Sequence, residues 1–168
     1  MYVKNWLKGW VIVAVSLILA TPAQAETVPG LWAVIPDGGT AVKLAMIGLQ
    51  DGDDEPRLFR ISCDKWGAVD LVFFGEAELV ENASYDLVLR INGRAESFSG
   101  KVERSESGSM LFWSSTIGLN HPLFERLAHA RRLDLSINGQ TWRMPIAQLS
   151  WSLEPFRDWC EDLAPAVR

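Results

Sequence analysis

The sequence is poor in the residues from which catalytic and metal sites are most often built. It has two cysteines and two histidines among 168 residues. No C-x-x-C, H-E-x-x-H, G-x-S-x-G, P-loop or dinucleotide-binding pattern is present, and two histidines leave little room for a Ser-His-Asp site. We therefore expect a non-enzymatic protein without a cofactor or a metal site.

The sequence also lacks an excess of positive charge. It has 16 Lys and Arg against 21 Asp and Glu, a formal net charge of −5. Nucleic-acid binding needs a basic surface that neutralises phosphates, so this composition argues against DNA or RNA as a partner.

No apolar run is long enough for a comfortable membrane span, which needs about 20 residues. The N-terminus instead has Lys4 and Lys8, an apolar run over 11–20 and the small residues Ala23 and Ala25 around Gln24, the pattern of a secretory signal peptide. We expect residues 1–25 to be removed and residues 26–168 to form a single β-rich domain that is periplasmic or secreted. The alternative is a signal retained as a membrane anchor; after cleavage the protein would not be membrane-integral.

Both cysteines, Cys63 and Cys160, lie in the expected mature chain. In an oxidising compartment such a pair is most simply a disulfide, which here would close a loop of nearly a hundred residues. A redox or metal pair is the alternative, but it lacks both the C-x-x-C spacing and neighbouring histidines.

Alternating apolar and polar residues predict mainly β-strands. The clearest segments are two hairpins, 84–101 and 133–146, each turning at an Asn-Gly pair, Asn92-Gly93 and Asn138-Gly139. Further strands are expected over 31–35, 40–49, 57–63, 69–73, 76–80 and from Met110. The predicted fold is an antiparallel sheet or sandwich of hairpins, with Cys63 pointing into the core.

Two short helices are expected, at about 120–130 and 152–163. Asn120 is a candidate N-cap for the first, with Pro122 in its first turn. The second is expected to begin near Ser150 or Ser152, with a serine as N-cap and Pro155 in its first turn. Cys160 shares an apolar stripe with Phe156 and Leu163.

Three groups of residues could carry chemistry, but each has a simpler structural interpretation. The acidic run 51–55 lacks the spacing of an EF-hand and is interpreted as a solvated loop. His121, Glu125 and His129 are spaced by four, so they could share one helix face and ligate a metal, but a solvated face is the simpler interpretation. The strand residues Asp70 and Asp134 are both expected to face outward.

The abundant unusual residue is tryptophan. Six remain after residue 25: Trp32, Trp66, Trp113, Trp142, Trp151 and Trp159. Most alternate with other apolar residues, which indicates core packing. Trp66 and Trp151 are the exceptions expected at the surface, because both sit at turns, and they are the candidate binding residues for a protein interface or a glycan.

Residues 58–63, 85–93, 123–130, 133–137 and 156–160 together resemble the periplasmic type VI secretion accessory proteins called TagO or VasI. The looser pattern is also similar to the invasion-associated locus B proteins. The resemblance implies an exported β-rich module, with one disulfide between a sheet strand and the C-terminal helix, that acts in the cell envelope without a known catalytic role.

The leading hypothesis is an exported, non-enzymatic binding or accessory protein whose partner is an envelope protein or a glycan. One alternative is an inhibitor of an envelope hydrolase such as lysozyme, with the acidic loop 51–55 facing a basic enzyme. The other is a hydrolase that uses two carboxylates converging in one cleft.

Overall fold

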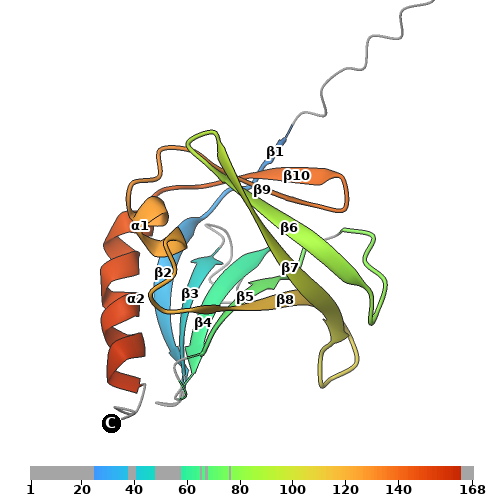
Figure 1. The fold of residues 1–168 in the computed structure, drawn as a ribbon, viewed down its shortest axis with the longest axis horizontal. Coiled ribbons are helices and arrows are strands. Elements are labelled where there is room, and N and C mark those ends of the chain that lie inside the picture. Colours follow the sequence, from blue (N-terminus) through green and yellow to red (C-terminus); the bar gives the residue numbers. More distant parts are fainter. Residues whose placement is uncertain are drawn as a thin grey trace, which may run out of the picture.

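The computed structural model describes residues 25–37, 41–47, 58–64, 66, 68–75 and 77–163. The expected signal peptide and the acidic run 51–55 lie outside these residues. The described strands are β1 Glu26–Thr27, β2 Leu31–Asp37, β3 Ala41–Ile47, β4 Phe59–Asp64, β5 Ala68–Phe73, β6 Ser84–Ile91, β7 Arg94–Arg104, β8 Leu111–Gly118, β9 Leu133–Ile137 and β10 Gln140–Met144, and the helices are α1 Leu123–Ala128 and α2 Leu149–Leu163 (Figure 1).

The described strands form one sheet in the order β1-β10-β9-β6-β7-β8-β5-β4-β3-β2. Neighbouring strands are antiparallel except β1 and β10, which run parallel. The prediction of a mainly β fold with two helices is confirmed. Of the two arrangements expected, these residues form a single sheet rather than the two stacked sheets of a sandwich.

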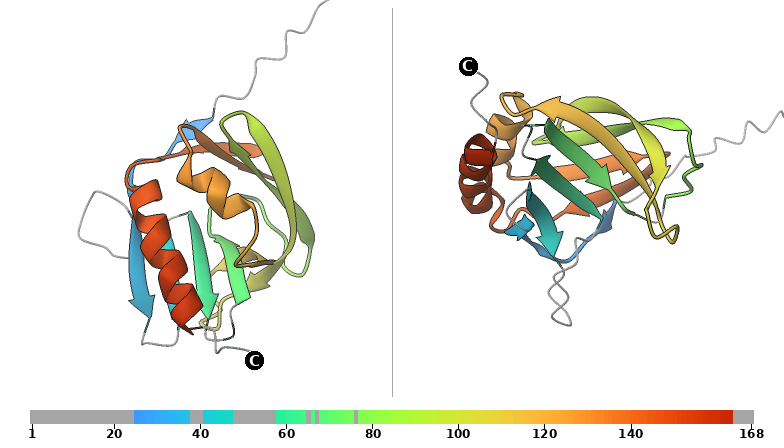
Figure 2. Two further views of the ribbon diagram at one scale, coloured as in Figure 1. Left: turned by 60° about the vertical axis from the view of Figure 1, so that its left-hand side comes forward. Right: turned by 90° about the horizontal axis from the view of Figure 1, so that it is seen from below.

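The sheet is curled so that its two ends meet. β1 and β2 stand at opposite ends of the strand order, yet only residues 28–30 separate them in sequence. Because a chain advances at most 3.8 Å per residue, the two edges must lie close together. Trp32 closes the gap: its backbone N–H donates to the carbonyl of Ala147 at 3.2 Å, and its indole Nε1 donates to the carbonyl of Pro145 at 2.8 Å. Figure 2 shows the resulting curvature.

Both predicted Asn-Gly hairpins are confirmed. Asn92 and Gly93 have φ of 51° and 87°, and Asn138 and Gly139 have φ of 47° and 78°. Two consecutive positive φ values are what a type I′ turn requires, and this turn matches the twist of the strands on either side. The hairpins lie side by side in the sheet, because β6 pairs with β9.

The core lies between the inner face of the sheet and α2. Phe156 and Cys160 of α2 are fully buried, and the helix contacts β2, β3 and β4. Phe156 packs on Phe124 of α1, with ring centroids 6.3 Å apart. Cys63 is buried as expected, on the same face of β4 as Ile61.

The helix starts differ from those predicted. Pro122, not Asn120, occupies the N-cap position of α1, and it is the ring nitrogen Nδ1 of His121 that accepts the hydrogen bond from the backbone N–H of Leu123. α2 begins at Leu149, earlier than expected, so Pro155 lies in its second turn. Since proline has no N–H, the carbonyl of Trp151 loses its usual donor within the helix.

Two strand predictions also need correction. The strand expected over 76–80 is absent over 77–80, where the N–H of Leu79 bonds the carbonyl of Ala77 in a tight turn. β10 ends at Met144, which leaves Ile146 39% exposed. No helix in the described part of the chain is long and apolar enough to cross a membrane.

Candidate functional site

The two tryptophans predicted at the surface are both exposed. Trp151 is 84% exposed and Trp66 is 74% exposed. Core packing is confirmed for Trp32, Trp113 and Trp142, all of which are buried. The prediction of core packing is wrong for Trp159, which is 42% exposed. Its position on α2 turns its side chain away from the buried stripe of Phe156 and Cys160.

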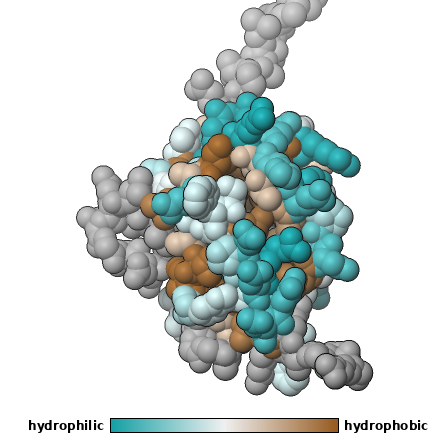
Figure 3. Space-filling model, turned by 90° about the vertical axis from the view of Figure 1, so that its left-hand side faces the viewer, coloured by the Kyte–Doolittle hydropathy of each residue, from teal (hydrophilic) through white to brown (hydrophobic). Residues whose placement is uncertain are grey.

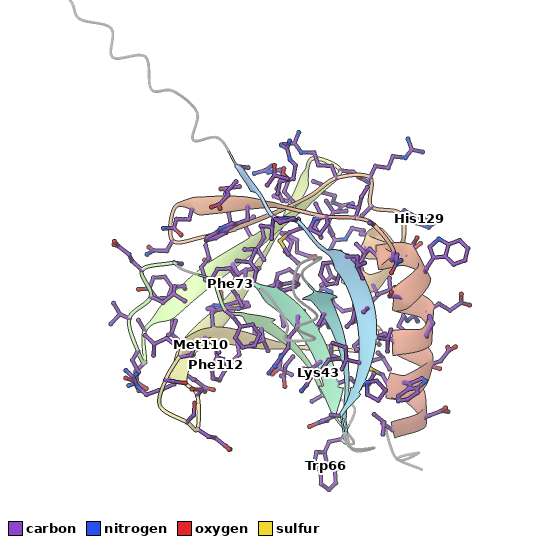
Figure 4. All side chains as sticks on the ribbon, turned by 180° about the vertical axis from the view of Figure 1, so that it is seen from behind. Lys43, Trp66, Phe73, Met110, Phe112 and His129 are labelled. Atoms are coloured by element: carbon purple, nitrogen blue, oxygen red, sulfur yellow. The ribbon has the colours of Figure 1, made fainter. Side chains whose placement is uncertain are left out.

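Trp66 and Trp151 do not form one patch. Trp66 belongs to the turn between β4 and β5, where the carboxylate of Asp64 accepts hydrogen bonds from the N–H groups of Trp66 and Ala68 at 2.8 and 3.2 Å. Figure 4 shows the Trp66 side chain projecting from the end of the molecule opposite His129. Trp151 lies in the first turn of α2. Cys160 lies in the last turn of α2, next to Cys63, which is near the end of β4 that leads to Trp66. At 1.5 Å per residue, about 13 Å of helix axis separates these two turns.

The solvent-facing side of α2 combines the exposed tryptophans with acidic residues. Because successive helical residues are rotated by about 100°, Trp151, Glu154 and Asp158 share one face. These three residues, with Ser150 and Pro155, line a shallow groove of about 340 Å³. Figure 3 views the side of the molecule that carries α2, where hydrophobic and hydrophilic side chains are interspersed.

A larger hollow, here called the arginine pocket, lies between the β6–β7 hairpin and α1. Its volume is about 590 Å³, and its lining includes Ile91, Arg94, Glu96, Glu125, Arg126 and His129. This volume falls within the range of small-molecule sites, about 300 to 1,000 Å³.

The Arg126 guanidinium forms the most constrained part of the pocket. It is paired with the carboxylate of Glu96, and both side chains are largely buried, at 22% and 23% exposure. Its Nε atom is buried and has no hydrogen-bond partner among the described residues. Burial lowers the pKa of Arg126, and the nearby charge of Arg94 lowers this pKa further.

Asn92 fixes the pocket's rim. Its side-chain oxygen accepts hydrogen bonds from the N–H groups of Arg131 and Arg132 at 2.8 and 3.1 Å, and its side-chain nitrogen donates to the carbonyl of His129 at 2.9 Å. The backbone N–H of Asn92 donates to the carbonyl of Arg132 at 2.9 Å. One turn residue therefore joins the tip of the β6–β7 hairpin to the segment that follows α1.

Asp134 points away from the core, as predicted, but it is only 4% exposed. One carboxylate oxygen accepts a hydrogen bond from Nε of Arg132 at 2.8 Å, and the other accepts one from Nε of Arg143 at 3.1 Å. The two arginines cover the carboxylate on the outer face of the sheet. Asp70, the other outward-facing strand acid, accepts a hydrogen bond from the hydroxyl of Thr116 at 2.7 Å.

The two cysteines meet between the sheet and α2. Cys63 and Cys160 are both buried, and their sulfur atoms lie 2.7 Å apart, beyond the roughly 2.05 Å of a disulfide bond. No bond joins them in this structure. Burial raises the pKa of each thiol above its ordinary value.

His121, Glu125 and His129 do not share a helix face as the spacing suggested. α1 begins at Leu123, so His121 precedes it, and its ring packs on Phe98 with centroids 5.7 Å apart. His129 lies at the C-cap. Among the residues that the structure describes, no group of three or more His, Cys, Asp and Glu side chains is placed to hold a metal ion.

The sequence interpretation missed the arginine pocket. The sequence of β7 contained a signal. Glu96 is an even number of residues from the buried Phe98 and Val102, so it lies on the same, inner face of the strand. A charged residue at such a position needs a partner. The alternation does not identify that partner, Arg126, because it lies on a different element.

Comparison with known proteins adds no relative: no family model, curated protein or solved structure matches the chain. The likeness to the TagO or VasI proteins stays a prediction.

Proposed function

We propose that this protein is exported to the periplasm or secreted, and that it acts there as a non-enzymatic binding or accessory protein of the cell envelope. The signal-peptide pattern in residues 1–25 supports export. The resemblance to the TagO or VasI proteins supports an envelope role. The α2 face with Trp151, Glu154 and Asp158 is the proposed contact surface.

The observation that carries this proposal is the 84% exposure of Trp151 on a regular helix. Burying a large apolar side chain contributes roughly 1.5 to 3 kcal/mol, and Trp151 contributes almost none of this to folding. Tryptophan is enriched among the residues that dominate protein interfaces, where its burial is completed by the partner. Trp159, 42% exposed, extends the apolar surface along the same helix.

The charges on α2 suggest the partner's chemistry. Glu154, Asp158, Glu161 and Asp162 outnumber the single basic residue, Arg157. A complementary partner would offer an apolar pocket for Trp151 rimmed by Lys or Arg. We favour a protein, because the groove beside Trp151 is shallow and the helix surface suits a protein partner. A glycan that stacks on the indole and donates hydroxyls to Glu154 is the alternative.

In an oxidising compartment, the thiols of Cys63 and Cys160 would be joined as a disulfide. This bond would connect β4 to the last turn of α2. The helix that presents Trp151 would then be held on the sheet by a covalent link as well as by the packing of Phe156.

The two other hypotheses stay predictions. The loop that a lysozyme inhibitor would use, residues 51–55, lies outside the described part of the chain. For the carboxylate-dependent hydrolase, the two outward-facing strand acids are engaged in contacts: Asp134 with two arginines and Asp70 with Thr116. No described contact favours either alternative over the binding role.

The test is site-specific photo-crosslinking in intact cell envelopes. A benzophenone amino acid replaces Trp151 in one variant and Val80, which is 62% exposed and lies away from α2, in the control. We expect a discrete crosslinked protein from position 151 and none from position 80. Binding of the purified partner should then weaken with Trp151→Ala and with Asp158→Lys.

Trp66→Ala is the matched control for these variants, because Trp66 is similarly exposed but belongs to the β4–β5 turn. Binding that is unchanged by Trp151→Ala and Asp158→Lys would reject the α2 face. A partner lost only with Trp66→Ala would place the interface on that turn instead.

A further inference from the structure

Positive charge is concentrated at one end of this acidic protein. Arg94 and Arg126 line the arginine pocket, and Asn92 binds the backbone of Arg131 and Arg132 directly beside it. Arg90 lies on the same hairpin and donates to the carbonyl of Gly93 at 3.3 Å. The protein as a whole carries a formal charge of −5, and Glu96, Glu125 and Asp134 offset part of the positive charge at this end.

The pocket lining has two arginines and two glutamates, Glu96 and Glu125, but among the described residues these groups form one ion pair. Glu96 pairs with Arg126, but Arg94 has no carboxylate within ion-pairing distance in the described part of the chain. Arg94 lies close enough to Arg126 for their charges to repel. An oxygen anion between the two guanidinium groups would relieve this repulsion.

The pocket is also rigidly built. Arg94 immediately follows the type I′ turn, and Glu96 lies two residues farther along β7, so both start from a regular strand. The four hydrogen bonds of Asn92 hold that turn against residues 129–132. A preformed site loses little conformational entropy when a ligand binds.

We propose that the arginine pocket binds a small organic anion of the carboxylate or phosphate class, held by Arg94 and Arg126. Its volume of about 590 Å³ accommodates a small molecule, and Ile91 supplies an apolar wall. Guanidinium groups bind the oxygens of carboxylates and phosphates in bidentate geometry. The exposed Glu125 lies on the same lining and disfavours a second anionic group there, so the ligand's far end is neutral or positively charged.

The site is separate from the proposed α2 face, with which its lining shares no residue. The test is an NMR titration of the uniformly ¹⁵N-labelled protein in low-chloride buffer, with inorganic phosphate in one series and butyrate, a monocarboxylate with a neutral far end, in another. We expect saturable shifts in residues 91–96 and 122–129. Arg94→Ala should weaken binding of the active probe about tenfold or more, the scale of one lost charged hydrogen bond.

Arg131→Ala is the matched control, because it removes the same charge from the same end of the molecule without altering the pocket lining. Its effect on the dissociation constant should stay below about twofold, as expected for a screened charge outside the site. Glu125→Gln should tighten binding of both anionic probes, because it removes a negative charge from the pocket lining. Arg94 is exposed, so its substitution leaves the fold intact, which the amide spectrum verifies.

A response to phosphate alone assigns the pocket to phosphorylated ligands, a response to butyrate alone to carboxylates, and a response to both to their shared anionic oxygens. Absence of saturable shifts with either probe overturns the proposal. Equal weakening by Arg94→Ala and Arg131→Ala also overturns it, because it would mean diffuse attraction rather than a site. Trp151→Ala should leave the anion titration unchanged, so failure of the α2 interface and failure of this pocket are distinguishable.

Discussion

Cys63 on β4 and Cys160 on α2 are distant in sequence, yet their sulfur atoms lie 2.7 Å apart in the buried core. Burial raises the pKa of both thiols, so each is held protonated when reduced. A protonated thiol is a poor nucleophile, which makes a structural role for this pair more consistent with its surroundings than a catalytic one.

We predict that the exported protein contains the Cys63–Cys160 disulfide. Cys160→Ala should then lower the free energy of unfolding by about 4 kcal/mol, because the bond restricts a loop of nearly a hundred residues in the unfolded chain. Urea unfolding without reductant measures the difference. In dithiothreitol most of this difference in the free energy of unfolding should disappear. If alkylation of the denatured, unreduced protein labels two thiols, the prediction is contradicted.

Asp134→Ala should lower the free energy of unfolding by about 1 to 3 kcal/mol, since the guanidinium groups of Arg132 and Arg143 lose a shared buried acceptor. Asp86→Ala is the control. Asp86 is exposed and accepts one hydrogen bond, from the hydroxyl of Ser99 at 2.6 Å, so its loss should cost at most about 0.5 kcal/mol. Chemical denaturation measures the free energy of unfolding of both variants. Equal losses of stability would argue against a structural role for the contacts of Asp134 with Arg132 and Arg143.

Trp113→Ala and Trp151→Ala should differ strongly in their effect on the free energy of unfolding. Trp113 is fully buried and its indole N–H donates to the carbonyl of Tyr85 at 2.9 Å, so truncation should cost about 3 to 5 kcal/mol of stability. Trp151 is 84% exposed, and its truncation should change stability by no more than about 0.5 kcal/mol. Thermal unfolding measures both; a large loss in the Trp151 variant would assign that residue to the fold rather than to a partner.

Glu81 should titrate below the ordinary range for a glutamate, because Arg104 donates two hydrogen bonds to its carboxylate, at 2.6 and 3.0 Å, and holds its pKa down. A lowered pKa in the folded state means that the pair's contribution is present above the unfolded pKa, about 4.3, and is lost as pH falls through the folded pKa. An NMR pH titration of the Glu81 side chain measures this. Arg104→Gln should raise the Glu81 pKa, and an unchanged value would show that the ion pair does not form in solution.

The hairpins were predictable because their causes are local. Asn92-Gly93 and Asn138-Gly139 adopt the positive φ values that few other dipeptides tolerate, and the strands beside them alternate over consecutive residues. The start of α2 was harder to predict from the sequence. Ser152, a candidate cap in the sequence, instead donates its hydroxyl to the carbonyl of Trp32 at 3.0 Å, a contact between residues far apart in the chain.

The candidate sites were predictable only in part. Exposure of Trp66 followed from its position at a turn. Trp151 is exposed as predicted, but it lies in α2 and not at a turn, and its exposure, like that of Trp159, depends on which side of α2 meets the sheet. The arginine pocket required knowledge of contacts between elements, because Arg126 of α1 meets Glu96 of β7 across a gap of 30 residues in sequence. No periodicity within either segment encodes that pairing.

The sequence by itself determined the strand alternation, the two type I′ turns and the inward direction of Cys63, since each depends on neighbouring residues and on steric limits of the backbone. Only the tertiary structure decided that the sheet curls until Trp32 bonds Pro145, that two arginines bury Asp134, and that Arg94 and Arg126 share one pocket. Burial and electrostatic environment are set by the elements that pack over a residue, and these come from distant parts of the chain.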